Sequence, residues 1–244
     1  MLLIAASAAG ASLTKSASTR SAITAWTAEQ AELAEAVVAE VMNDVFNDLE
    51  AVSAFVTEAE PNAEAFTRFV DSIDGTANAV GVGHVAIVPA ADTATHIQHQ
   101  SAERGIDYSI RRLTTDGDVV PASLESRSEF YPVQVFAVGD LIKPYITPGT
   151  PAAELALGVD PGFNPDWEGP IRMAAAANGP VVSEFIDVHL QIVALDRVFF
   201  ASVPVHDENG AVTGLVAAPM LEALLLRDLD SRVLDDVEWE VFPQ

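Results

Sequence analysis

The feature that most constrains the fold is a long amphipathic run, Ser21 to Glu60, whose apolar side chains recur every three or four residues. The stripe consists of Leu33, Val37, Val41, Val45, Leu49, Val52 and Val56, with acidic residues between its members. A straight helix of this length spans roughly 60 Å. We therefore expect a stalk, the backbone of a smaller domain, or a dimer seam. The alternative is a core helix broken by a kink.

The residues before this helix lead to a separate expectation. Residues 1–20 hold an apolar run, Met1 to Leu13, followed by Lys15 and Arg20. About 20 apolar residues are needed to cross a bilayer, so the run is too short to span one alone. We interpret it as a signal-peptide remnant or the end of a membrane helix. The chain ends after a strand-like segment, as an excised domain would.

Beyond Pro61 the pattern mixes short helices and strands. We predict helices over residues 62–73, 92–104 (with Asp92 as N-cap), 172–177 and 219–229. We predict strands over residues 79–88, 108–113, 130–138, 181–193, 197–205, 211–217 and 237–242, and loops over 114–128 and 139–169. Asn209-Gly210 marks a hairpin turn between two of the strands. Consecutive hairpin strands indicate an antiparallel sheet of the α+β class.

The charge balance excludes one large class of partners. The chain has 36 acidic and 12 basic residues, a formal net charge of −24. Such a field repels phosphate backbones and anionic lipid, so we expect no nucleic-acid binding. The acids are scattered, which is typical of a solvated acidic surface. The absence of cysteine excludes disulfides, thiolate metal sites and a cysteine nucleophile.

Catalytic motifs are scarce, so we do not predict an enzyme. No Walker loop, HExxH or GxSxG motif occurs, and Gly81-Val82-Gly83 lacks the third glycine of a dinucleotide fingerprint. His96 and His99 share a helix face, but two ligands do not make a metal site. We expect no metal and no cofactor. A small-molecule hydrolase whose site has no local motif is the enzymatic alternative.

Residues 129–193 are the best candidate for a ligand-binding wall. Two strand-like runs, 130–138 and 181–193, flank a loop and a short helix. Asp140 follows the first run, where a carboxylate reaches a pocket mouth or caps the next loop. Ser183 lies within the second run and hydrogen-bonds a ligand or the backbone. Arg172 begins the helix, where an ion pair with a nearby acid is the structural alternative.

With these residues in view, the chain resembles the CHASE domain, the extracellular sensory domain of histidine kinases, cyclases and cytokinin receptors. The ordered matches are Phe66-x-x-Phe69, a degenerate R-x-x-F-E segment at 99–105, Tyr131-Pro132-Val133, Gly158-Val159-Asp160, and Arg172 with Ala176 and Gly179. Together they cover roughly residues 25–242.

The resemblance implies a long N-terminal helix followed by two PAS-like modules with antiparallel sheets, placed between two transmembrane helices. We accordingly expect a stalk and dimerisation helix at 21–60, a distal sensing module at 61–193 and a membrane-proximal module at 194–244. The implied location is extracytoplasmic, tethered to the cell membrane in the full-length protein.

The resemblance also implies ligand contacts. The distal module of the plant receptors binds adenine-type cytokinins with an aspartate after the Y-P-V strand and a threonine after the helix. Asp140 and Ser183 fall at those positions, and Met173 falls near an apolar contact. We expect Val133, Val135 and Met173 to supply apolar contact, with Tyr131 in the same set. Because serine replaces threonine and the loop holds several prolines, the ligand class stays open between purine-like molecules and small organic acids.

The predicted function is therefore that of a sensor. A small ligand in the distal module would shift the paired helices of a homodimer and signal to a cytoplasmic effector domain of the same full-length protein. The alternative is a ligand-free structural or dimerisation module whose pocket is filled by its own side chains.

Overall fold

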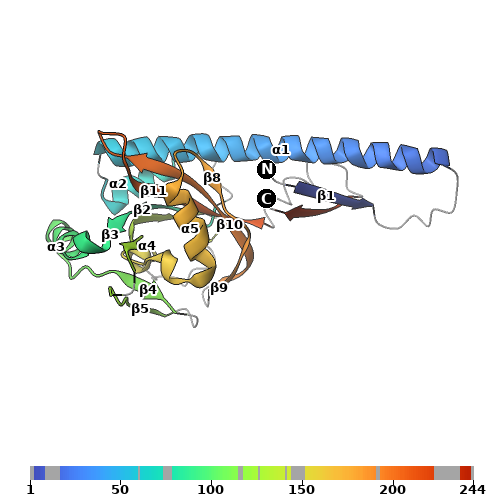
Figure 1. Ribbon diagram of the computed structural model, residues 1–244. Helices are drawn as coiled ribbons and strands as arrows, with labels where there is room; N and C mark the ends of the chain where they lie inside the picture. The colour runs from blue at the N-terminus through green and yellow to red at the C-terminus, as the bar shows by residue number, and fades with distance from the viewer. Residues whose placement is uncertain are drawn as a thin grey trace.

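The computed structural model is an α+β fold in which a long helix, α1 (Ala17–Ala59), runs along one face of an antiparallel sheet (Figure 1). The structure describes residues 3–8, 17–59, 61–73, 79–114, 118–125, 127–140, 142–143, 152–190, 193–222 and 237–242. The predicted long helix is confirmed, and it ends just before Pro61, which cannot continue it.

The main sheet has six strands in the order β7-β2-β11-β10-β8, with β9 paired to β10. The strands are β2 (Gly81–Ala86), β7 (Val133–Val138), β8 (Val181–Val182), β9 (Ile186–Leu190), β10 (Val193–His206) and β11 (Val212–Leu221). All of their pairings are antiparallel, which confirms the predicted class. The β10–β11 turn is held by Asp207, whose carboxylate accepts hydrogen bonds from the backbone N–H groups of Asn209 and Ala211. Gly210 there has φ +80°, a conformation that favours glycine.

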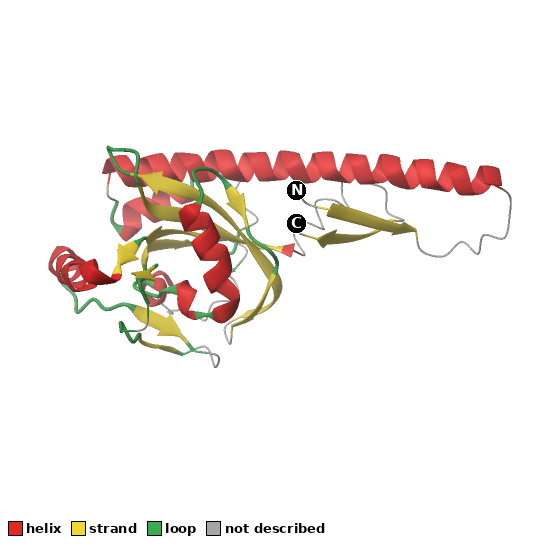
Figure 2. Cartoon of the chain, in the orientation of Figure 1, coloured by secondary structure: helices red, strands yellow, loops and turns green. Residues whose placement is uncertain are grey.

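Helices cover both faces of this sheet, as Figure 2 shows. On one face Val45, Leu49 and Val52 of α1 are buried against the sheet, in a cluster that includes Val216. On the other face α5 (Pro165–Ala176) packs Ile171 and Ala174 on the sheet. Neighbouring residues of one strand face opposite sides, so β11 serves both clusters.

The apolar stripe of α1 is used within the chain. From Val37 to Val56 its members pack in the core beneath the helix, whereas Leu33 is 44% exposed. The dimer seam that the stripe suggested is thus occupied by the chain's own sheet over this length. The physical reason is that side chains alternate between the two faces of a strand, and those on this face of the sheet are apolar.

Smaller elements surround this framework. They are α2 (Ala63–Val70), β3 (Val88–Pro89), η1 (Ala90–Asp92), α3 (Thr93–Arg104), β4 (Arg111–Leu113), β5 (Val119–Pro121), β6 (Glu129–Phe130), α4 (Ala152–Ala156) and η3 (Pro161–Phe163). The Asn62 side chain caps α2, and Gly105 ends α3 with φ +64°. Asp92 precedes α3 as predicted, but its side chain makes no capping hydrogen bond.

Several predicted segments need correction. The segment 114–128 is not all loop, because it contains β5. The run 181–193 is not one strand, because the chain leaves the ladder at 183–185 between β8 and β9. The segment 139–169 is not all loop, since it contains α4, η3 and the start of α5, which Asn164 caps. The helix expected from residue 219 is wrong at its start, because Pro219 to Leu221 belong to β11. Residues 223–236 lie outside the described residues.

The ends of the described chain meet beside α1. β1 (Leu3–Ala8) pairs antiparallel with β12 (Val237–Phe242), and this pair lies along the N-terminal half of α1 (Figure 1). Leu3 to Ala8, interpreted above as a signal remnant or membrane-helix end, is therefore a strand in the structure. Among the described residues, no helix is both long enough and apolar enough to cross a membrane.

The strands on the two sides of residue 193 share one sheet. β10 and β11 lie after it, and they pair with β8, β9 and β2, which lie before it. The module boundary expected there falls inside the β9–β10 hairpin, because the apolar β10 is an internal strand that needs a partner on each side.

Candidate ligand site between helix α5 and the sheet

The candidate site lies between α5 and the sheet face opposite α1. α5 begins where the Asn164 side chain accepts a hydrogen bond from the Asp166 N–H, with Pro165 in its first turn. Its inner side presents Ile171 and Ala174 to Val85 and Leu215 of the sheet.

A small cavity lies beneath α5. Its volume is about 30 Å³, and its walls include Val85, Ile171, Ala174, Ser183, Phe200 and Ala217. A cavity of this size holds about one water molecule. The site is therefore nearly closed in this conformation, and a ligand larger than water requires α5 or its flanking loops to move.

Ser183 is buried at the edge of this cavity. Its hydroxyl accepts a hydrogen bond from the Phe200 N–H (2.8 Å) and donates one to the Glu184 carbonyl (2.7 Å). The Ser183 N–H donates to the Phe200 carbonyl (2.9 Å). Since its only hydroxyl proton is already used, Ser183 can offer a ligand an acceptor lone pair but not a donor without rearrangement.

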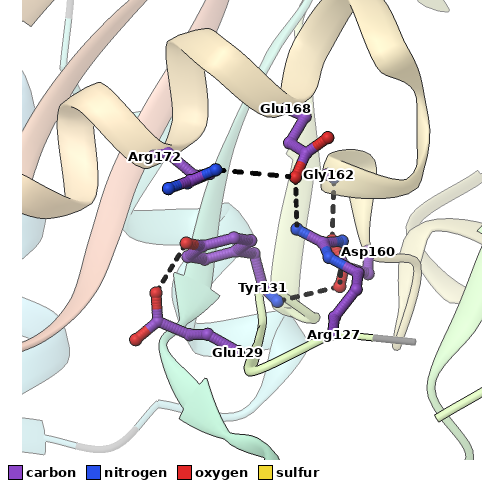
Figure 3. Close-up of polar contacts among 7 residues, drawn as sticks. All are labelled: Arg127, Glu129, Tyr131, Asp160, Gly162, Glu168 and Arg172. Carbon is purple, nitrogen blue, oxygen red and sulfur yellow. Dashed lines mark hydrogen bonds and ion pairs between the residues drawn. The ribbon is translucent and has the colours of Figure 1, made fainter. Parts of the chain in front are cut away.

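Next to the cavity, a buried carboxylate anchors the polar network in Figure 3. Asp160 accepts hydrogen bonds from the Tyr131 N–H (3.0 Å) and the Gly162 N–H (2.7 Å), and Arg127 Nη1 lies 3.3 Å away. Burial raises the pKa of the Asp160 carboxyl, and the two N–H groups and Arg127 offset part of that effect.

The network continues from Arg127 to α5. The guanidinium of Arg127 lies over the rings of Tyr131 (5.4 Å) and Phe163 (5.1 Å). Its Nη2 is 4.0 Å from Glu168 Oε1, and the same oxygen is 3.9 Å from Arg172 Nη1 (Figure 3). These contacts connect α5 to the segment before β7, so they help to set the position of α5 over the cavity.

Tyr131 closes one side of this network. Its hydroxyl donates to Glu129 Oε2 at 2.6 Å. Burial, together with the hydrogen bond and the negative charge of Glu129, raises the pKa of the Tyr131 hydroxyl, which is therefore neutral at physiological pH. Its ring packs in the same apolar cluster as Ile171.

The structure brings together three of the six predicted contact residues. Tyr131 and Val133 belong to the cluster beneath α5, and Ser183 lines the cavity. Asp140 is elsewhere: its side chain is 84% exposed, and its carboxylate is 2.6 Å from Lys143 Nζ. Met173 lies on the outer side of α5 and is 49% exposed.

Val135 faces away from the cavity because β7 contains a bulge. His84 pairs with Val135 and Val85 with Val133, so Gln134 has no partner on β2. The extra residue turns Val133 toward α5 and Val135 toward α1, where it joins the core beneath that helix. An unbroken alternation would have placed both valines on one face.

Sequence reasoning missed the structural role of Gly158-Val159-Asp160. Gly158 has φ +75°, and a Cβ at this position would collide with the Ser109 carbonyl oxygen. Asp160 is buried, as described above. The motif can be recognised in the sequence, but its residues do not indicate that Asp160 binds Arg127. No local sequence pattern marks Arg127 either. Among the described residues, no group of three His, Cys, Asp or Glu side chains could hold a metal ion.

The fold and site define an α+β module, in which a long helix and a short covering helix enclose an antiparallel sheet with a small cavity. The CHASE domain model matches residues 60–241, well over half of the sequence, and the chain belongs to the CHASE domain family. No curated protein matches the chain in sequence.

Three solved structures with a similar arrangement of the backbone are sensory domains of bacterial chemoreceptors. The ligand-binding domain of Campylobacter jejuni Tlp3, in complex with L-valine, has a TM-score of 0.42 and 11% identity over 87% of this chain and 65% of that chain. The periplasmic sensory domain of C. jejuni Tlp1 has a TM-score of 0.40 and 14% identity over 86% and 63%. The Pseudomonas aeruginosa PAO1 amino acid chemoreceptor PctC, in complex with GABA, has a TM-score of 0.36 and 13% identity over 82% and 62%.

The chain thus spans less than two thirds of each of these three domains. Likeness at this level assigns neither a ligand nor a binding mode to the chain.

Proposed function

We propose that this chain is the extracytoplasmic sensor domain of a membrane-bound signalling receptor. The single observation that carries the proposal is membership of the CHASE domain family over residues 60–241. The receptor would bind a small molecule outside the membrane and signal to an effector domain of the same full-length protein. The chain itself would perform no chemistry.

The proposed binding site is the space between α5 and the sheet. Tyr131, Val133 and Ser183 are the predicted contact residues that lie there. Because the cavity is only about 30 Å³, binding must select a conformation in which α5 stands further from the sheet. A ligand shifts such an equilibrium only through its different affinity for the two states.

The route to α1 runs through the sheet. β10 and β11 contact α5 on one face and α1 on the other. A displacement of α5 that repacks these strands would therefore change how α1 sits on the sheet. α1 is the element that we propose to transmit the signal, in a homodimer that uses the acidic and alanine-rich side of the helix left exposed by the sheet.

We retain two modules as part of the proposal, with revised limits. The six-stranded sheet and its covering helices would be the distal sensing module. The β1–β12 pair, which lies along the N-terminal half of α1, would belong to the membrane-proximal module. Sedimentation of the full chain at several concentrations tests the dimer: a monomer at all concentrations would argue against paired helices in this chain.

Ligand binding is tested by thermal shift and calorimetry with purines, small organic acids and amino acids. A true ligand raises the melting temperature in proportion to the logarithm of its concentration above the Kd. Ala217→Val places two methyl groups in the cavity and should abolish the shift. Met173→Ala, on the exposed side of α5, is the matched control and should leave it unchanged.

The closed cavity favours a second candidate function, a ligand-free structural module. In that case no compound raises the melting temperature, and Ala217→Val only alters packing. A shift that survives Ala217→Val would place the ligand elsewhere and would contradict the α5 site, but not the sensor function.

A further inference from the structure

The wall of the cavity beneath α5 restricts the chemistry of a ligand that could bind there. Its lining residues carry hydrocarbon side chains, apart from the two serines Ser183 and Ser202. None of these lining residues is acidic or basic. The ligand class inferred from this wall rests on the proposed function, because it concerns the molecule that the same site would take.

Both serines are buried, and the proton of each hydroxyl is already used. The Ser183 hydroxyl donates to the Glu184 carbonyl at 2.7 Å. The Ser202 hydroxyl donates to the Val181 carbonyl at 3.4 Å. A serine hydroxyl carries a single proton, so neither residue can donate to a ligand without losing its present bond. The serines therefore add no free hydrogen-bond donor to the wall.

The backbone N–H groups around the cavity are engaged as well. The Phe200 N–H donates to the Ser183 hydroxyl, and the Ser183 N–H donates to the Phe200 carbonyl. Ile171 and Ala174 lie inside α5, where N–H groups pair along the helix. The other lining residues of the sheet belong to paired strands. An acceptor atom of a ligand would lose its hydrogen bonds to water here and gain none, which is costly.

The helix α5 also shows where the cavity can enlarge. Pro170 lies inside the helix and has no N–H to pair with the carbonyl one turn earlier, and Gly169 beside it is a weak helix former. The half before this point is held by the contact of Glu168 with Arg127 (Figure 3). The half after it carries Ile171 over the cavity. Bending at residues 169–170 would therefore open the cavity while the first half of α5 stays in place.

We propose that the site beneath α5 takes a neutral, largely hydrocarbon molecule. Such a ligand gains by burying its apolar surface and has no polar atom left unpaired. An anion would lose its hydration and find no counter-charge in the wall. Of the ligand classes that the sequence leaves open, purine-like molecules carry ring nitrogens without a donor here, and small organic acids carry an unpaired charge.

The test is a calorimetric titration of the full chain with two pairs of probes of matched shape. Indole and purine are fused rings of the same size, and each has one N–H, but purine has three further nitrogens that accept hydrogen bonds. Nitrobenzene and benzoate share one shape, and only benzoate is charged. We expect indole and nitrobenzene to bind saturably at one site, each about tenfold or more tightly than its partner in the pair.

Ala217→Val fills part of the cavity and should weaken indole binding by about tenfold or more. Ala176→Val is the matched control, because it makes the same change at an exposed residue of α5. It should leave indole binding unchanged. Equal binding of indole by wild type and Ala217→Val would overturn the assignment of the ligand to this cavity.

A readout on the unsubstituted chain covers the case in which Ala217→Val does not fold. In nuclear Overhauser spectra, the ring protons of bound indole should show contacts with the methyl groups of Ile171 and Leu215. They should show none with Val45 and Val52, which lie on the α1 face of the sheet. Contacts with the α1 face alone, or with neither face, would overturn the assignment.

The results with the four probes separate this ligand class from the sensor function. Purine that binds as tightly as indole would overturn the ligand class and leave the sensor function standing. It would indicate that opening of α5 exposes a donor, such as Trp167 Nε1, which is buried without a partner but does not line the closed cavity. Benzoate that binds as tightly as nitrobenzene would also overturn the class alone. Binding of none of the four would overturn the class, and the absence of any thermal shift with the wider panel of compounds would then count against the α5 site itself.

Discussion

The carboxylate of Asp160 is withdrawn from solvent and faces the N–H groups of Tyr131 and Gly162 and the guanidinium of Arg127. A buried charge is tolerable only when such partners replace its lost hydration. The residue therefore fixes a loop, two strand ends and, through Arg127 and Glu168, the start of α5. We regard it as a positioning residue for the candidate site.

We predict that Asp160→Asn lowers the free energy of unfolding by about 3 kcal/mol, as expected for breaking a buried ion pair. The amide has one oxygen for two backbone donors, and it removes the nearer of the two carboxylates beside Arg127. Urea denaturation measures the loss. Asp166→Asn, at an exposed acid a few residues away, should change stability by less than about 0.5 kcal/mol. Equal effects of the two substitutions would show that Asp160 is not an anchor.

The lowered pKa of His84 predicts acid sensitivity. Its folded value is about 4, below the usual value of about 6.5. Between these values the unfolded chain binds a proton that the folded chain does not, so stability falls as the pH falls through this window. We expect a contribution on the order of 2 kcal/mol, after discounting for the partial exposure of the ring.

The measurement compares wild type with His84→Asn by urea unfolding at about pH 7.5 and about pH 4.5. The variant cannot titrate at this position, so the wild type should lose more stability than the variant on acidification. Carboxylates titrate in both proteins, so their effect on stability cancels when the two losses of stability are subtracted. His206→Asn is the control. A pH dependence identical in wild type and His84→Asn would refute the role assigned to His84.

At the scale of the element, the two halves of α1 have different surroundings. Its C-terminal half buries one side on the sheet, while β1 and β12 lie beside its N-terminal half. The helix is therefore stabilised by tertiary packing along much of its length, and not by helix propensity alone.

We predict a position-dependent cost for the same substitution along α1. Leu49→Ala removes a fully buried side chain and should lower stability by about 3 kcal/mol. Leu33→Ala, at a leucine that is 44% exposed, should change stability by less than about 0.5 kcal/mol. Thermal and urea unfolding of both variants test the pair. A large effect at Leu33 would indicate that this residue is buried in an assembly, such as the proposed dimer.

At the scale of the whole molecule, the charge distribution opposes compaction. The 36 acidic and 12 basic residues leave a net charge of −24. Like charges on a folded surface lie closer together than in the unfolded chain, so their repulsion destabilises the compact state. Salt screens this repulsion over a Debye length of about 10 Å at 0.1 M.

We therefore expect added salt to stabilise the protein. Raising sodium chloride from about 0.05 M to about 1 M should raise Tm by on the order of 5 °C. Scanning calorimetry measures the change, and potassium chloride is the control for a specific effect of sodium. A Tm that is constant or falls with both salts would mean that surface ion pairs outweigh the repulsion.

Much of the fold was predictable because the spacing of apolar residues along the chain indicates helices and strands. The long helix, the antiparallel α+β class, the β10–β11 hairpin and the final strand are all confirmed. The family was also predictable from short motifs in a fixed order, and the match of the CHASE domain model to residues 60–241 confirms it. Breaks in regular structure were not predictable: the gap between β8 and β9 depends on hydrogen bonds to Ser183 that join distant segments.

The candidate site was only partly predictable for the same reason. Val133 and Val135 look equivalent in the sequence, yet the bulge at Gln134 sends them to opposite faces. Asp140 follows an apolar strand, as a pocket residue would, but it pairs with Lys143 at the surface.

The sequence by itself determined the long helix, the strand-rich region after it, the acidic character and the family, because each depends on the order or number of residues along the chain. Only the tertiary structure decided that the stripe of α1 is covered by the chain's own sheet, that Arg127 meets Asp160, and that Val85 and Ile171 line one cavity. These contacts join residues far apart in the chain, and long-range pairing depends on how the elements pack, which no local pattern encodes.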